Sequence, residues 1–154
     1  MVNDCFRFSA AAIFTITGLA KIISAFGSAA ILAEADPLLH VSFRHLMIVA
    51  AVVELAVAAT CAFSQLQKFA VVAIAWLASI LIVYRIGLFE IGWHRGCPCL
   101  GNLTDAIHIS PQLADNTMKV ILAYLFIGSC GILLREWLKS KKQASKFEPN
   151  GESH

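Results

Sequence analysis

Hydrophobic residues gather in four long stretches of the chain, separated by shorter and more polar segments. The stretches run over about residues 6–32, 43–63, 69–92 and 118–138. Each is long enough to cross a bilayer as a helix, because about 20 predominantly apolar residues span the hydrocarbon core. The pattern therefore predicts an all-α fold: a polytopic membrane protein whose four transmembrane helices form one antiparallel bundle.

The composition supports this interpretation and limits the classes of function. Of the 154 residues, 58% are hydrophobic and 14% are charged, whereas an average soluble domain carries about a quarter charged residues. The four stretches use most of the chain, so we expect one transmembrane domain over residues 1–138 and no separate soluble catalytic domain. Membrane lipid is an expected partner, and nucleic acid is not.

The first stretch also has features of a cleavable signal peptide. Residues 10–20 resemble its apolar region, and the small residues at 28–30 resemble its cleavage site. The apolar run nevertheless continues past Lys21 to Leu32, and the preceding segment carries one arginine balanced by Asp4. We therefore expect the first stretch to be retained as a helix.

The distribution of lysine and arginine predicts the orientation of the bundle. Cytoplasmic segments carry an excess of these residues close to the helix ends. The flank that follows the fourth stretch is rich in them: Arg135, Lys139, Lys141, Lys142 and Lys146. The loop over residues 33–42 contains neither. We therefore expect cytoplasmic N- and C-termini, with residues 139–154 forming a disordered basic tail and the loop over residues 93–117 facing outward.

Two charged residues lie within the apolar stretches and are expected to pair. Lys21 lies 11 residues before Leu32, and Glu54 lies 11 residues after Phe43. Since a helix rises about 1.5 Å per residue, the two side chains reach the same depth in a helical hairpin. Each buried charge alone costs roughly 2.5 to 3.5 kcal/mol on insertion scales. The pair is either an ion pair that fixes helix register or a functional site, a proton relay or an anchor for a quinone head group.

Arg85 is closer to an expected membrane surface. It lies about seven residues from the outer end of the third stretch, near enough for its long side chain to extend to the interface or towards Glu90. Steering of an anion or of a quinone carbonyl is the functional alternative.

The outward loop contains two cysteines one residue apart, Cys97 and Cys99. In an extended backbone, residues i and i+2 lie roughly 6.6 Å apart, within the window of about 4.4 to 6.8 Å for the Cα atoms of a disulfide. The small ring, stiffened by Pro98, would be strained and easily reduced. In an oxidising compartment such a pair is suited to thiol–disulfide exchange.

The neighbours of this pair leave its chemistry open. His94 and Arg95 would lower the thiol pKa, while the negative end of the third helix dipole would raise it. A metal site is the first alternative, because His94 and His108 could join Cys97 and Cys99 as ligands for zinc or copper. A static disulfide that only closes the loop is the second.

Three further cysteines are expected to take no part in exchange. Cys61 and Cys130 lie within the second and fourth stretches, where a thiol usually behaves as a small buried hydrophobe, and Cys5 lies near the N-terminus. None is placed to resolve a mixed disulfide in the outward loop. A resolving thiol would therefore come from another protein.

Several of these residues occur in an order that resembles a known family. Gly18-Leu19-Ala20-Lys21, Glu54-Leu55 and Cys97-Pro98-Cys99-Leu100-Gly101 together resemble the MauE branch of the DoxX-like membrane proteins. The resemblance covers about residues 6–138, and Leu100 replaces the aromatic residue more usual in MauE-type loops.

The resemblance implies a four-helix protein of the bacterial inner (plasma) membrane. MauE is associated with maturation of methylamine dehydrogenase, a disulfide-rich enzyme, alongside a thioredoxin-like protein, and DoxX relatives include a subunit of a thiosulfate:quinone oxidoreductase. We therefore expect a membrane redox or maturation component that exchanges disulfides through Cys97 and Cys99 with a thioredoxin-like or disulfide-rich periplasmic partner, with quinone as the candidate carrier. The alternatives are a non-enzymatic assembly subunit with a static disulfide and a metal-handling membrane protein.

Overall fold

A computed structural model describes residues 2–27, 30–63, 67–92 and 111–146 of the chain. This part is built from the helices α1 (Val2–Ala25), α2 (Phe43–Phe63), α3 (Gln67–Glu90) and α5 (Pro111–Lys146), with a short 3-10 helix, η1 (Ala30–Ala33), between the first two. All four long helices are apolar and long enough to cross a membrane. The all-α, four-helix prediction is therefore confirmed.

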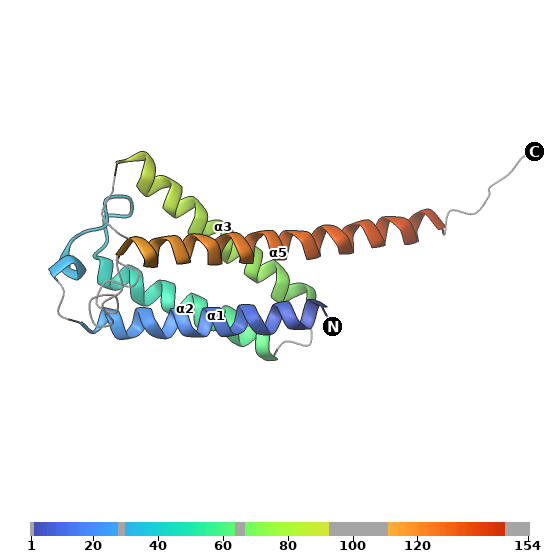
Figure 1. Cartoon of the computed structure of the whole chain (residues 1–154), viewed down its shortest axis with the longest axis horizontal. Coiled ribbons are helices and arrows are strands. Elements are labelled where there is room, and N and C mark those ends of the chain that lie inside the picture. Colours follow the sequence, from blue (N-terminus) through green and yellow to red (C-terminus); the bar gives the residue numbers. More distant parts are fainter. Residues whose placement is uncertain (1, 28–29, 64–66, 93–110, 147–154) are drawn as a thin grey trace, which may run out of the picture.

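Successive helices run in opposite directions and form two hairpins (Figure 1). The most extensive helix contacts join α1 to α2 and α3 to α5, while α2 and α3 touch less. The C-terminal ends of α1 and α3 and the N-terminal ends of α2 and α5 are at the same end of the molecule, where α3 diverges from the others. We call this the connector end, because the described residues that join α1 to α2 (26–27 and 30–42) lie there.

The helix bounds differ from the hydrophobic stretches at two places. α1 ends at Ala25 rather than near residue 32, because the last turn tightens to an i→i+3 bond from Gly27 N to Ser24 O of 3.0 Å. Apolar residues then continue into η1, so hydrophobicity alone does not mark the end. α5 starts at Pro111, a favoured first helical residue, and continues to Lys146. Residues 139–146 of the expected disordered tail are therefore helical, and residues 147–154 lie outside the described residues.

The connector between α1 and α2 is organised around the buried side chain of Asp36. Its Oδ1 accepts hydrogen bonds from the backbone N–H groups of Leu38 (2.9 Å) and Leu39 (2.8 Å). Its Oδ2 accepts a short hydrogen bond from the hydroxyl of Tyr84 on α3. The backbone of Asp36 also pairs with Val41 through N–H to O at 2.8 Å. One carboxylate thus shapes the connector and joins it to the second hairpin.

The packed core occupies the half of the bundle opposite the connector end. It contains side chains from all four helices, among them Phe14, Cys61, Ile74 and Leu125, each at most 2% exposed. Close helix approach depends on small residues: a Cβ atom added at Gly128 would lie 2.3 Å from Cε2 of Phe6. The connector half is less filled, and the candidate site lies there.

Candidate functional site

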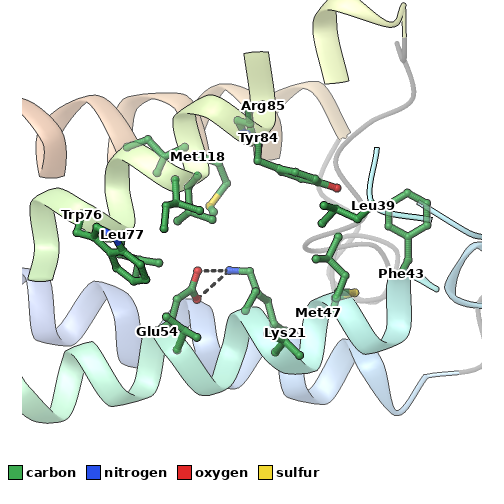
Figure 2. Close-up of a pocket in the computed structure, with 17 residues that line it drawn as sticks. Lys21, Leu39, Phe43, Met47, Glu54, Trp76, Leu77, Tyr84, Arg85 and Met118 are labelled. Atoms are coloured by element: carbon green, nitrogen blue, oxygen red, sulfur yellow. Dashed lines mark hydrogen bonds and ion pairs between the residues drawn. The ribbon is translucent and has the colours of Figure 1, made fainter. Parts of the chain in front are cut away.

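The half of the bundle near the connector encloses a cavity of about 240 Å³. Figure 2 shows it between α2 and α3, with α1 and α5 completing its walls. The walls are almost entirely aliphatic, aromatic or thioether side chains. The lining residues are Lys21, Leu39, Phe43, Leu46, Met47, Val49, Ala50, Val53, Glu54, Trp76, Leu77, Ile80, Leu81, Tyr84, Arg85, Met118 and Leu122. We refer to this cavity as the core pocket.

Lys21 and Glu54 form an ion pair at one side of the core pocket, as their depth predicts (Figure 2). Lys21 Nζ lies 2.8 Å from Oε1 and 2.9 Å from Oε2 of Glu54. The hydroxyl of Thr17, one turn earlier on α1, donates a third hydrogen bond to Oε2 at 2.9 Å. Only 4% of the Lys21 side chain and 2% of the Glu54 side chain are exposed. The predicted contact is confirmed, and Thr17 is a partner that the sequence analysis missed.

This arrangement leaves hydrogen-bonding capacity at two residues that line the core pocket. An ammonium group has three donors, and the contacts to Glu54 use two of them. Each carboxylate oxygen has two lone pairs, so Oε1 of Glu54 retains one after accepting from Lys21. The pair can therefore donate to a carbonyl oxygen and accept from a hydroxyl group at the same place in an apolar pocket.

Arg85 lies at another side of the core pocket and has a different partner from the one expected. Its Nη1 is 2.8 Å from Oδ1 of Asp115, near the start of α5. Oδ2 of the same carboxylate is 2.7 Å from Nζ of Lys119. Arg85 therefore pairs with Asp115 rather than with Glu90, because the packing of α3 on α5 brings a carboxylate 30 residues away in sequence against it. Asp115 is the first residue of the fourth candidate span, and the expected reach of Arg85 to the interface stays a prediction.

The second terminal nitrogen of Arg85 supplies a further donor. Nη2 is buried and has no hydrogen-bond partner among the described residues. A buried donor without a partner costs about 1 to 3 kcal/mol, so a ligand oxygen at this place would be stabilised. Tyr84, beside it in Figure 2, also lines the pocket while its hydroxyl group is engaged with Asp36.

The core pocket borders the outer surface of the bundle between α2 and α3. Three of its lining residues are exposed on that surface: Val49 (60%), Trp76 (58%) and Ile80 (44%). When these helices span a bilayer, such a surface faces acyl chains rather than water. A ligand of the core pocket can therefore enter from the lipid phase.

The cysteine pair and its expected neighbours are not part of the described structure. Cys97, Cys99, His94, Arg95 and His108 all lie outside the described residues. The described residues on either side of the loop, Gly92 and Pro111, are both at the connector end.

The remaining cysteines are free thiols with different surroundings. Cys61 is fully buried in the packed core, as expected for a small hydrophobe, whereas Cys130 is exposed on α5. The expectation of a buried Cys130 is wrong, because much of α5 has no neighbouring helix. Within the described ranges, no group of three or more His, Cys, Asp or Glu residues could hold a metal ion.

No protein-family model matches this chain, and neither curated proteins nor solved structures give a significant match.

Proposed function

We propose that this protein is a membrane component of thiol–disulfide exchange whose core pocket binds a quinone. In this proposal Cys97 and Cys99 exchange disulfides with a thioredoxin-like or disulfide-rich protein outside the membrane, and electrons pass between the cysteine pair and the quinone. The observation that carries the quinone is an apolar cavity with a buried Lys21–Glu54 pair.

The ligand chemistry matches both redox forms of a quinone. A quinone has two carbonyl oxygens that accept hydrogen bonds, and Lys21 Nζ and Arg85 Nη2 each have a donor to offer. A quinol has hydroxyl groups that donate, and Glu54 Oε1 has a lone pair to accept. The apolar walls suit the ring, and an isoprenoid tail would leave between α2 and α3 into lipid.

The redox step balances without another reactant. Two thiols that form one disulfide release two electrons and two protons, and a quinone that becomes a quinol takes up the same number. The reverse reaction, quinol to dithiol, uses the same groups. Protons at the buried end of the quinone can pass through Glu54, which lies beside the ammonium group of Lys21.

Chain length limits how far Cys97 can lie from the end of α3. Cys97 is five residues from Gly92, the last described residue of the α3 end, and five extended residues reach at most about 18 Å. Tyr84 and Arg85, which line the core pocket, are on the last two turns of α3. A tether of this length allows the thiols to approach the part of α3 that lines the core pocket.

The likeness of residues 97–101 to a MauE-type loop supports the thiol chemistry. The scarcity of lysine and arginine in the connector supports an outward, oxidising location for the loop and cytoplasmic termini. In this proposal the membrane is the bacterial inner membrane.

The experiment measures thiols and quinol together in purified protein held in lipid nanodiscs. The protein is reduced, freed of reductant and mixed with decylubiquinone, after which thiols are counted by maleimide labelling and quinol by absorbance. We expect one quinol for each disulfide formed, no reaction in C97S or C99S, and an unchanged reaction in the control C5S/C130S. Thiols that remain reduced with excess quinone would overturn the proposal. A disulfide that resists reduction would favour the assembly subunit instead.

A further inference from the structure

α5 is longer than a bilayer requires, and its excess length is basic. Its 36 residues correspond to about 54 Å of helix at 1.5 Å per residue, against about 30 Å of hydrocarbon. The helix runs past the ends of the other three (Figure 1). No charged residue occurs between Lys119 and Arg135, and four cations follow from Arg135 to Lys142. The change from apolar to basic marks a membrane interface on the side away from the connector end.

A shallow hollow lies on α5 at this change. It is lined by Gly131, Leu134, Arg135, Leu138, Lys139 and Lys142. Each of these positions lies three or four residues from another of them, so they form one stripe along the helix. Gly131 has no side chain, and a Cβ atom added there would meet nothing within 4 Å, so the space beside it is open. No acidic residue lines the hollow.

The hollow is apolar towards one end and basic towards the other, which matches the acyl chains and the charged head group of a lipid. Gly131 and Leu134 lie towards the apolar part of α5, and Lys139 and Lys142 lie towards its basic end. An acyl chain would lie against the first two while phosphate oxygens reach the cations. The tryptophan ring of Trp137 lies beneath Nζ of Lys141, 4.3 Å from its centroid, and tryptophan is enriched at the headgroup level.

We infer that this hollow binds the head group of an anionic phospholipid. Three cations close together favour a lipid with net negative charge over a zwitterionic one, since each Lys or Arg near an anionic surface adds to the attraction. Arginine can hold a phosphate through two parallel hydrogen bonds, and lysine supplies point charges. The inference does not depend on the proposed redox function, because it concerns the opposite end of α5 from the cysteine loop.

The experiment uses Trp137 as the reporter of lipid at the hollow. In a W76F/W93F background, Trp137 is the remaining tryptophan of the chain. The full-length protein is reconstituted with brominated lipids, which quench a nearby tryptophan, either phosphatidylglycerol or phosphatidylcholine. We expect a several-fold higher relative affinity for the anionic lipid, reduced to near equality in R135Q/K139Q/K142Q.

Two control variants test whether the lipid preference comes from this hollow, rather than from the overall positive charge of the protein or from misfolding. R44Q/K68Q/K119Q removes the same number of charges elsewhere and should keep the preference for phosphatidylglycerol. R135K/K139R/K142R keeps the charges and should keep it as well. Equal quenching by both lipids in the reporter protein, or equal loss of preference in both glutamine triple variants, would overturn the inference. Loss of the preference on adding inorganic phosphate at constant ionic strength would also overturn it, because the site would then bind free phosphate.

Discussion

The side chains of Lys21 and Glu54 meet at 2.8 Å although Lys21 lies only one turn from the end of α1 at Ala25. Glu54 is near the middle of α2 (Phe43–Phe63). The helices also pack on both sides of the pair, where Gly18 lies against Leu55 and Ala25 clusters with Met47. The ion pair is therefore part of the α1–α2 interface and also part of the wall of the core pocket.

Breaking the pair from one side should cost more than removing both charges. Lys21→Leu or Glu54→Leu leaves one buried charge without its partner, a loss of about 3 to 5 kcal/mol. The double variant K21L/E54L should lose clearly less than the sum of the two. The measurement is the free energy of unfolding in detergent, analysed as a double-mutant cycle. Losses that simply add would contradict direct coupling, and Lys68→Leu, at the start of α3, serves as the control for removal of a cation.

Filling the core pocket should prevent ligand binding without unfolding the bundle. Ala50 lines the pocket, and Ala56, on the same helix, is exposed and does not. We expect Ala50→Phe to weaken decylubiquinone binding by tenfold or more, equivalent to about 1.4 kcal/mol or more. Ala56→Phe should leave it unchanged. Quenching of Trp76, which lines the pocket, gives the Kd. Equal affinities in both variants would place the quinone elsewhere.

The contact of α1 with α5 should tolerate no side chain at Gly128. A methyl group there would overlap the ring of Phe6, with 2.3 Å to Cε2, so Gly128→Ala should destabilise the protein by about 1 to 3 kcal/mol. Gly131→Ala, one turn later in open space, should stabilise the helix by up to about 1 kcal/mol. Thermal unfolding in detergent compares the two variants. Equal stability of Gly128→Ala and Gly131→Ala would contradict this contact. In a Phe6→Ala background, Gly128→Ala should cost less than it does in the original protein, because the ring that it overlaps is gone.

The sequence alone was enough to predict the four long helices and the buried Lys21–Glu54 ion pair. The physical reason is the same in both cases. Lipid imposes a length on each span and a high cost on an unpaired charge, so hydrophobic runs and lone charges are strongly constrained. The predicted end of α1 was several residues too late, but Lys21 still pairs with Glu54, and Gly18 packs on Leu55 beside the pair.

The partner of Arg85 and the core pocket could not be predicted in this way. Asp115 precedes the most apolar part of α5 and was assigned to a loop, so only tertiary packing brings it to Arg85. A cavity depends on how side chains from four helices fill the space between them, which no pattern along one stretch records. Thr17 was missed for a similar reason, because a threonine in a membrane helix usually bonds its own backbone.

Tyr84 belongs to two structures at once, since its ring lines the core pocket and its hydroxyl group holds Asp36. Asp36 in turn fixes the backbone of Leu38 and Leu39, and Leu39 returns to line the same pocket. A ligand that contacts Tyr84 in the core pocket therefore also affects the connector, through the hydrogen bond from Tyr84 to Asp36. Binding of a ligand in the core pocket should therefore slow amide hydrogen exchange in the connector, over residues 36–41.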